Sequence, residues 1–207
     1  YRFNVSSSQP HPASLPRQWD SFVGRGEQLL ELGTRFVEGA RLVTVQGPPG
    51  VGKTRFALQF AETSAIHGID AEPLFVALAE ASNEAEVVTT LAQALDVPLA
   101  GSSSISSRLQ RTLAVRSGGL IVLDNTEQLV DSLPELLSLW MAAAPQLCWL
   151  ATSQRSLGME AEQVFTLSCL TGTEAKSLFE QRSRAHGMRR ERMDAELVER
   201  ICGRVEA

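Results

Sequence analysis

The most constraining feature of the sequence is GPPGVGKT, residues 47–54, which meets every fixed position of the pattern G-x-x-x-x-G-K-[ST]. The run before it, RLVTVQG (41–47), is apolar and β-branched and predicts a buried strand, and the pattern after it predicts a helix over residues 53–67. Backbone N–H groups of such a loop and the positive end of the helix both attract an anion. The sequence therefore predicts a phosphate-binding loop.

Each part of this loop has an expected role toward a nucleotide. Lys53 supplies a positive charge for the β and γ phosphates, and the Thr54 hydroxyl is a ligand for Mg²⁺. Gly50 and Gly52 let the backbone approach where a Cβ would obstruct. A glycine-rich turn with a chance lysine is the alternative, and the complete pattern between a strand and a helix disfavours it. The predicted nucleotide-binding residues of the loop are Gly47, Pro48, Pro49, Gly50, Val51, Gly52, Lys53, Thr54 and Arg55.

A second motif is LIVLDNTEQL, residues 120–129, in which an apolar run ends at Asp124. Because a strand-end carboxylate emerges at the carboxyl edge of a parallel sheet, Asp124 is the predicted Mg²⁺ carboxylate, with a plain turn as the alternative. Asn125 follows it and cannot act as a base. If a helix begins at Asn125, Glu127 lies near the γ-phosphate and is the candidate base; otherwise it is an exposed acid at a helix start.

Apolar runs and helical patterns alternate along most of the chain, which predicts a mainly parallel sheet of five strands covered on both faces. We expect a three-layer α/β/α fold of the P-loop NTPase class. The expected organisation is a linker at 1–18, an α/β nucleotide-binding domain at 19–170 and the start of a truncated helical lid at 171–207. The expected strands are residues 41–47, 73–79, 119–125, 147–153 and 163–170.

Composition narrows the class of protein. With 43% hydrophobic and 21% charged residues the chain is typical of a globular protein, and a net charge of −5 argues against a nucleic-acid binder that uses its whole surface. The arginine-rich run 182–192 is interpreted as a solvated face, with nucleic-acid contact as the alternative. Three scattered cysteines and no long apolar run predict a reducing, cytoplasmic setting, with no disulfide framework, zinc site or membrane contact.

Several strings together resemble the nucleotide-binding module of STAND ATPases, the signal-transduction ATPases with numerous domains. The resemblance is to the bacterial branch found in AfsR-like and LuxR-type transcriptional regulators, with the plant NB-ARC domain and the apoptotic-protease activator as more distant relatives. It covers residues 15–207. The strings are FVGRGEQL (22–29), RLVTVQGPPGVGKTRFALQFA (41–61), LIVLDNTEQL (120–129) and LATSQRSLGMEAEQVFTL (150–167).

The resemblance implies that the segment before the first helix lies by the base and ribose of ATP or ADP. Phe22 and Val23 would pack on adenine, and Arg25 would reach a phosphate or a neighbouring subunit. The alternative is that this segment is a turn and Phe22 an ordinary core residue. ATP is expected over GTP because the chain has no NKxD motif for guanine. The proline-containing lid segment usual in relatives is not found before residue 207, and a winged-helix domain would follow it.

The same resemblance assigns a sensor role to the polar end of the fourth strand. Thr152 and Ser153 would face the γ-phosphate. Relatives commonly place an arginine directly after the serine, whereas this chain has Gln154 there and Arg155 one position later. Arg155 is therefore either a γ-phosphate sensor or an exposed arginine without a ligand.

Three functions remain open from the sequence. The first is a slow nucleotide-gated switch that self-associates in its ATP state and acts on transcription through DNA-binding domains outside this chain. The second is an AAA+-type motor or loader with steady ATP turnover and a trans arginine finger, for which Arg155, Arg108 and Arg111 are candidates. The third is a scaffold that binds no nucleotide, and the intact Lys53 and Asp124 argue against it.

Overall fold

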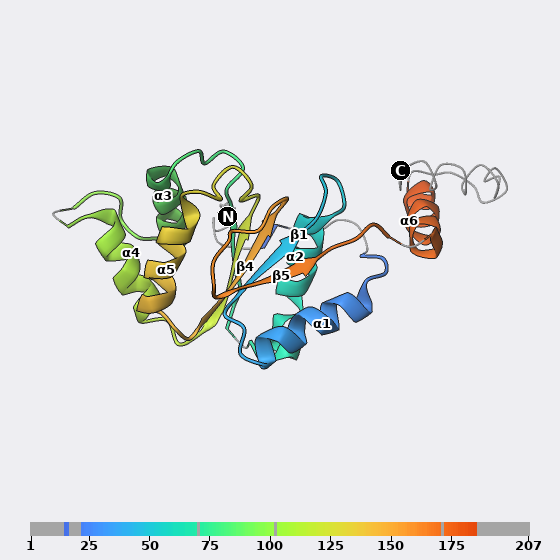
Figure 1. The fold of residues 1–207 in the computed structure, drawn as a ribbon, viewed down its shortest axis with the longest axis horizontal. Coiled ribbons are helices and arrows are strands. Elements are labelled where there is room, and N and C mark those ends of the chain that lie inside the picture. Colours follow the sequence, from blue (N-terminus) through green and yellow to red (C-terminus); the bar gives the residue numbers. More distant parts are fainter. Residues whose placement is uncertain (1–14, 17–21, 70, 102, 171, 186–207) are drawn as a thin grey trace, which may run out of the picture.

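The computed structural model describes residues 15–16, 22–69, 71–101, 103–170 and 172–185, and within them the chain forms a five-stranded parallel sheet with helices on both faces (Figure 1). The strands are β1 (Leu42–Gln46), β2 (Leu74–Ala77), β3 (Gly119–Asp124), β4 (Leu147–Ser153) and β5 (Glu162–Thr166). The helices are α1 (Gly26–Val37), α2 (Lys53–Glu62), the 3-10 helix η1 (Ser64–His67), α3 (Glu84–Ala94), α4 (Ile105–Ala114), α5 (Leu133–Ala143) and α6 (Gly172–Ala185). The predicted α/β class is confirmed.

The strand order is β2-β3-β4-β1-β5, so β4 separates the strand that leads into the phosphate loop from the strand that ends at Asp124. In register, Gln46 of β1 lies opposite Ser153 of β4, and Leu123 of β3 lies opposite Ala151. All strands are parallel, so their carboxyl ends share one edge of the sheet. This edge therefore gathers the loop after β1, the end of β3 and the end of β4.

Alternate residues of the inner strands feed two separate apolar cores, because successive side chains of a strand point to opposite faces. On one face the sheet packs against α3, α4 and α5, where Trp140 stacks on Trp149 with ring centroids 5.7 Å apart. On the other face it packs against α1 and α2, where Phe56 stacks on Phe165 at 5.5 Å. The sheet is thus fixed on both sides.

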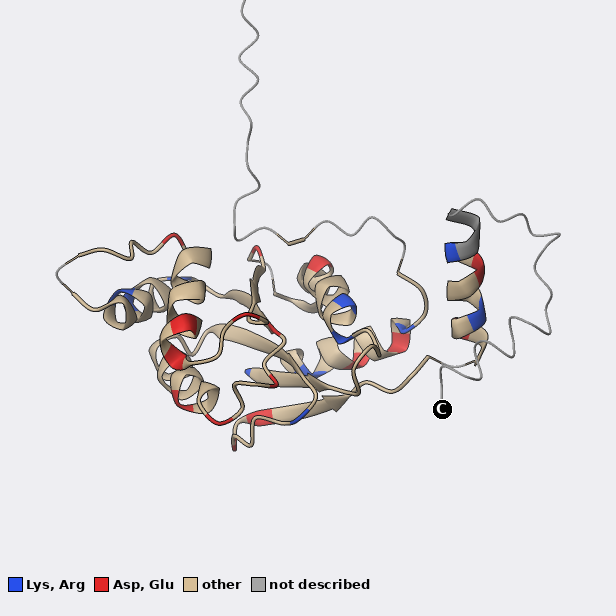
Figure 2. Cartoon of the chain, turned by 90° about the horizontal axis from the view of Figure 1, so that it is seen from above, with Lys and Arg blue, Asp and Glu red and all other residues tan. Residues whose placement is uncertain are grey.

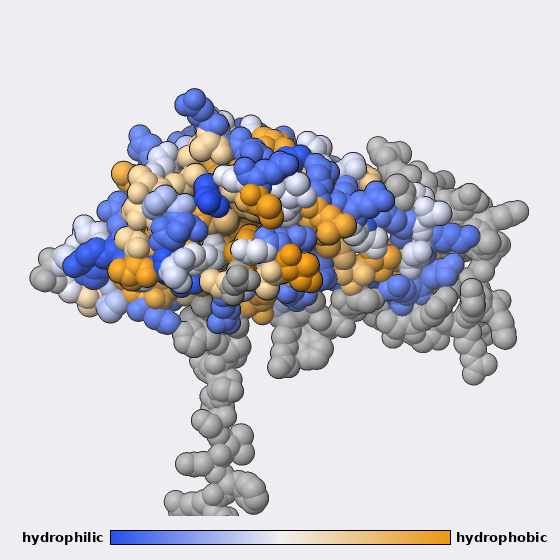
Figure 3. Space-filling model, turned by 90° about the horizontal axis from the view of Figure 1, so that it is seen from below, coloured by the Kyte–Doolittle hydropathy of each residue, from blue (hydrophilic) through white to orange (hydrophobic). Residues whose placement is uncertain are grey.

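Charge is confined almost wholly to helices and loops (Figure 2). Within strands β1 to β4, Asp124 is the single charged residue, and its side chain is only 8% exposed. A charge in such a place costs free energy unless it has partners, so the buried Asp124 needs hydrogen-bond donors around it. The exposed apolar side chains, by contrast, are interspersed with polar ones on the face shown in Figure 3.

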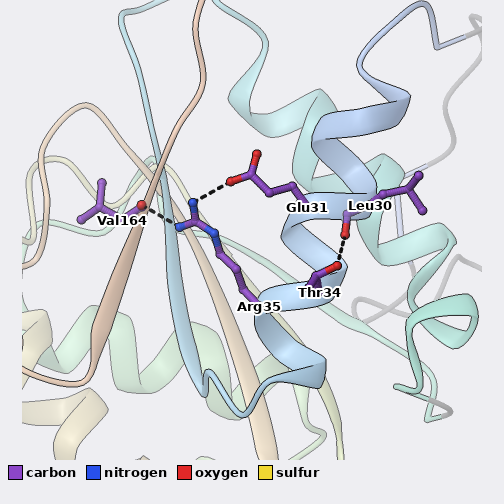
Figure 4. A network of polar contacts seen from close by, with 5 residues as sticks. All are labelled: Leu30, Glu31, Thr34, Arg35 and Val164. Carbon is purple, nitrogen blue, oxygen red and sulfur yellow. Dashed lines mark hydrogen bonds and ion pairs between the residues drawn. The ribbon is translucent and has the colours of Figure 1, made fainter.

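The edge strand β5 is held by an arginine of α1 (Figure 4). Arg35 Nη1 donates to the Val164 carbonyl over 2.8 Å, and Arg35 Nη2 donates to Glu31 Oε1 over 2.8 Å. Its guanidinium carbon also lies 4.9 Å from the centre of the Phe165 ring. One side chain therefore joins α1 to both the backbone and a core ring of β5.

Several boundaries differ from those predicted. The helix expected over 53–67 ends at Glu62 and is followed by η1, and the left-handed Gly68 (φ 76°) closes that segment. The last strand ends at Thr166 rather than near 170. Residues 186–192 of the arginine-rich run 182–192 lie outside the described residues, whereas residues 182–185 form the end of α6. The predicted domain boundaries remain predictions. None of the helices in the described part has the length and apolar character of a membrane span.

Candidate nucleotide site

The phosphate loop needs glycine at two positions because of its backbone conformation. Gly50 and Gly52 have φ of 78° and 95°, which are values that residues with a Cβ rarely adopt. A Cβ at either position would meet no protein atom within 4 Å, so crowding within the protein is not the reason for glycine there. Close approach does apply at Gly47, where a Cβ would lie 2.6 Å from the Leu167 carbonyl oxygen.

Lys53 begins α2 and folds back over the loop. Its Nζ donates to the carbonyl oxygens of Gly47 and Pro48 over 3.0 and 3.1 Å. Residues 48–50, in the first half of the loop, are exposed. Arg55 lies half-buried in the first turn of α2. The ammonium group therefore lies over an open loop whose centre is accessible to a ligand.

A chain of hydrogen bonds links the helix after the loop to β3 and β4. Thr54 Oγ1 donates to Asp124 Oδ2 over 3.1 Å, and Thr152 Oγ1 donates to Asp124 Oδ1 over 2.6 Å. The Thr152 hydroxyl in turn accepts the Asn125 N–H over 2.9 Å. Both carboxylate oxygens are thus held in place, and one of them faces the Thr54 hydroxyl.

The Thr54 and Asp124 oxygens suit a magnesium ion, which binds oxygen ligands and often takes only one or two of them from protein. Among the described residues no cluster of three or more His, Cys, Asp or Glu side chains could hold a metal by itself. A cation at Thr54 and Asp124 would therefore take its remaining ligands from phosphate oxygens and water. The donor set fits Mg²⁺ bound together with a nucleotide.

Ser153 connects the end of β4 to the loop. It is fully buried, its carbonyl accepts the Gly47 N–H over 3.3 Å, and its hydroxyl accepts the Arg155 N–H over 3.1 Å. Thr152 and Ser153 thus lie between Asp124 and the start of the phosphate loop, as the strand order requires. Their contact with a γ-phosphate remains a prediction.

The chain does not become helical directly after β3, so the condition under which Glu127 was a candidate base on a helix is not met. Asn125 has φ of 67°, and the next helix begins only at Leu133. Asparagine tolerates the left-handed region better than most residues, and its N–H is already bonded to Thr152, so the backbone turns at this point. The Asn125 side chain points toward Gln128, with Nδ2 3.5 Å from Oε1.

Glu127 therefore lies in a turn, held by the residues that follow β4. Gln154 Nε2 donates to Glu127 Oε1 over 2.9 Å, and Arg155 Nη2 donates to the Glu127 carbonyl over 3.2 Å. The other carboxylate oxygen, Oε2, is buried and has no hydrogen-bond partner within the described part of the chain. Gln154 and Arg155 thus hold Glu127 in place.

Arg25, which directly precedes α1, contacts the phosphate loop through its side chain. Its Nη2 donates to the Val51 carbonyl over 2.9 Å, and its side chain is buried. Phe22 is partly buried against the apolar core that also takes up Val51, and Val23 is half-buried beside it in sequence. The structure brings this segment to the loop; its contact with adenine remains a prediction.

The two other arginines considered for a trans role hold their own loop. Arg108 Nη2 donates to the Leu99 carbonyl over 3.1 Å, and Arg111 Nη2 donates to Ser103 Oγ over 3.4 Å. Both lie on α4, which covers the sheet together with α3 and α5. Neither is placed with the phosphate loop.

Sequence reasoning missed three side chains that shape the site. Thr126 is fully buried and its Oγ1 donates to the Thr152 carbonyl over 3.1 Å. Gln128 Nε2 donates to the Leu78 carbonyl over 2.8 Å and so ties the turn after β3 to the end of β2. The third is Glu174 of α6, whose Oε1 accepts the Arg25 N–H over 3.0 Å. A polar run directly after a buried strand was the available signal for the first two.

Comparison with known proteins adds the family. The AAA domain family matches residues 35–156, a segment that contains the phosphate loop, Asp124 and Arg155. The chain belongs to the AAA domain family. This AAA domain has the fold of P-loop ATPases, and it is an AAA-type ATPase module.

One relative of this AAA domain is a Mycobacterium tuberculosis protein that carries the name of an HTH-type transcriptional regulator. It is 37% identical over 145 residues, which make up 69% of this chain and 16% of the relative. This chain therefore spans a small part of that relative's length.

Two solved structures share the fold at low identity. ORC1 of Aeropyrum pernix, solved in complex with DNA, superposes with a TM-score of 0.60 and 21% identity, over 80% of this chain and 50% of that one. A STAND protein of Pyrococcus horikoshii with a tetratricopeptide repeat sensor superposes with a TM-score of 0.52 and 19% identity, over 91% of this chain and 28% of that one. At these identities the likeness concerns the fold alone.

Proposed function

We propose that this AAA domain is the ATP- and ADP-binding switch of a larger regulator of the STAND type, with slow turnover. The observation that carries the proposal is the bonded set Thr54, Asp124 and Thr152, followed by Asn125 in a left-handed turn. The set is prepared for a magnesium–nucleotide complex. The residue directly after Asp124 is an amide that cannot take a proton from water.

The remaining acid supports slow rather than absent hydrolysis. Glu127 Oε1 is bonded to Gln154, and no donor from residues 15–16, 22–69, 71–101, 103–170 or 172–185 reaches Oε2. A buried carboxylate oxygen without a donor favours a bound water, which is the partner that a general base needs. The carboxylate that would activate this water lies in a turn rather than on a rigid helix. We therefore expect a low rate of ATP hydrolysis.

The wider role is proposed from the chain's relatives. A relative named as a transcriptional regulator extends well beyond the matched segment, which supports a module inside a larger protein. In this proposal DNA is contacted by domains outside the chain, and the ATP state favours self-association. Phe22 and Val23 pack on adenine, and Ser153 and Arg155 respond to the γ-phosphate.

The test measures bound nucleotide and turnover of the purified 207-residue chain. Co-purifying ADP, with less than about one turnover per minute against typical enzyme rates of 1–1,000 per second, supports the switch. Lys53→Ala should abolish binding, whereas Lys176→Ala, which removes an exposed lysine of α6, should not.

Two other outcomes would overturn the proposal. Several turnovers per minute, abolished by both Lys53→Ala and Glu127→Gln, would identify a motor-like ATPase. No affinity for ADP or ATP in the unmodified chain would leave a scaffold without nucleotide.

A further inference from the structure

A carboxylate of α6 reaches the segment before α1. Glu174 Oε1 accepts the Arg25 N–H over 3.0 Å. At the neighbouring Gly24, with φ of 72°, a Cβ would lie only 2.4 Å from the same carboxylate oxygen. Glycine at this position therefore provides both the left-handed turn and the space that the Glu174 carboxylate occupies.

The residue that Glu174 holds is in turn bonded to the phosphate loop. Arg25 is 7% exposed, and its Nη2 donates to the Val51 carbonyl over 2.9 Å and to the Ser168 carbonyl over 3.1 Å. Its other terminal nitrogen, Nη1, is buried and has no hydrogen-bond partner among the residues that the structure describes. A buried guanidinium with an unused donor is able to gain a hydrogen bond when a ligand or water arrives.

Electrostatics link the same two residues. Burial lowers the pKa of Arg25 from its ordinary value, and the negative charge of Glu174 opposes that shift. Arg25 also has φ of 62°, an uncommon value for a residue with a Cβ. The arginine is therefore held in a strained and desolvated position by the groups around it.

The helix that carries Glu174 has little other anchorage in an apolar core. Over residues 172–182, whose exposure is described, no side chain is buried. Figure 1 shows α6 at one end of the molecule, beyond the sheet and next to the start of α1. A helix that buries so little apolar surface depends on polar contacts for its placement.

We propose that Glu174 is a positioning residue that couples the placement of α6 to nucleotide occupancy of the phosphate loop through Arg25. A nucleotide in the loop orders the Val51 carbonyl and the Arg25 guanidinium, and Arg25 in its ordered position favours the Glu174 contact. Because coupling between sites is reciprocal, the Glu174 contact strengthens nucleotide binding by the same factor. The inference rests on the proposed function, since it needs the loop to bind ADP.

Hydrogen exchange of the full chain, with and without ADP and Mg²⁺, tests the coupling. ADP should slow exchange in residues 172–185 about threefold or more in the unmodified chain. Glu174→Ala should lose this response and raise the Kd for ADP about fivefold, at the lower end of typical coupling factors. Glu174→Gln keeps an acceptor oxygen. Its exchange response and its Kd for ADP should lie between those of the unmodified chain and those of Glu174→Ala. Lys176→Ala removes an exposed charge of α6 and should behave as the unmodified chain.

A double-mutant cycle separates coupling from a purely structural role. Arg25→Met keeps apolar bulk but removes the guanidinium, so the Kd change for ADP in the double variant with Glu174→Ala should be smaller than the product of the single changes. If ADP binds while exchange in α6 is unaffected by it, the inference is overturned and the proposed switch stands. If the unmodified chain binds no ADP, both fall. Glu174→Gln serves as the test variant should Glu174→Ala fail to fold.

Discussion

Thr54 Oγ1 and Asp124 Oδ2 lie 3.1 Å apart although 70 positions separate the two residues in the chain. A cation that bridged these oxygens would need the negative charge of Asp124, while the fold needs only an acceptor for the Thr152 hydroxyl. The two oxygens of Asp124 therefore have different roles. Oδ2, beside Thr54, is the one that would bind the cation, and Oδ1 serves the fold by accepting the Thr152 hydroxyl.

Asp124→Asn should abolish the strengthening of ADP binding by Mg²⁺. The asparagine keeps one acceptor oxygen for Thr152, so the thermal unfolding temperature should stay close to that of the unmodified chain. Calorimetric titration with ADP, with and without Mg²⁺, measures the effect. Asp131→Asn changes an exposed acid of the following turn and is the matched control. An unchanged Mg²⁺ effect in Asp124→Asn would rule this carboxylate out as a ligand.

Gly52→Ala should lower the free energy of unfolding by roughly 1–2 kcal/mol, because a Cβ is disfavoured at its φ of 95° even though no atom obstructs it. Gly26→Ala at the start of α1 has open space and no positive φ, and should be neutral or raise that free energy by up to about 1 kcal/mol. Urea unfolding of the pair measures the difference. Equal effects would mean that backbone conformation is not what selects glycine in the loop.

Gln154→Leu should reduce ATP turnover and leave the Kd for ATP nearly unchanged. The substitution removes the donor to Glu127 Oε1, which lies 2.9 Å from the amide nitrogen, and so frees the carboxylate to rotate. Single-turnover hydrolysis measures the rate. If Gln154 acts through Glu127, adding Gln154→Leu to Glu127→Gln should cost little more. Fully additive losses would show that the two residues act independently.

Glu86 should make the stability of the chain depend on pH at the start of α3. Its carboxylate accepts hydrogen bonds from the backbone N–H and the hydroxyl of Ser82, and these lower the pKa of Glu86 from its ordinary 4.5. A lowered pKa gives stability that is present above the unfolded-state pKa and is lost as pH falls through the lower folded-state value. Glu86→Gln should therefore be less stable than the unmodified chain at pH 7.

The difference between Glu86→Gln and the unmodified chain should shrink below pH 4.5. Urea midpoints measured across pH 3–7 follow the change. Glu84→Gln, in the same first turn, controls for the helix dipole. A difference that stayed constant with pH would exclude the hydrogen-bonded carboxylate as its cause.

Much of the fold follows from the sequence because buried parallel strands are continuous apolar runs. LIVLD and LCWLATS were located correctly, since burial on both faces leaves no room for polar residues until the strand reaches the functional edge. The phosphate loop was equally clear, because its glycines and Lys53 form a fixed spacing.

The turn after β3 was not predictable, because its conformation depends on Thr152, which lies on another strand 27 residues further along the chain. A helix beginning at Asn125 was one of the possibilities that the local sequence left open. The bond from the Asn125 N–H to the Thr152 hydroxyl removes that option. Arg25 was singled out by resemblance, but its hydrogen bond to Val51 depends on packing that no local pattern encodes.

The bond between Arg35 and the Val164 carbonyl has a consequence for how copies of the chain could meet. An edge strand normally offers its backbone to any passing strand, which is how sheets grow from one molecule into the next. At the middle of β5 the Arg35 guanidinium already occupies the Val164 carbonyl, so this acceptor is not free for a strand of another copy. Assembly of two copies at the β5 edge would thus use side-chain contacts, which are specific for their partner. Backbone pairing, by contrast, is almost independent of sequence.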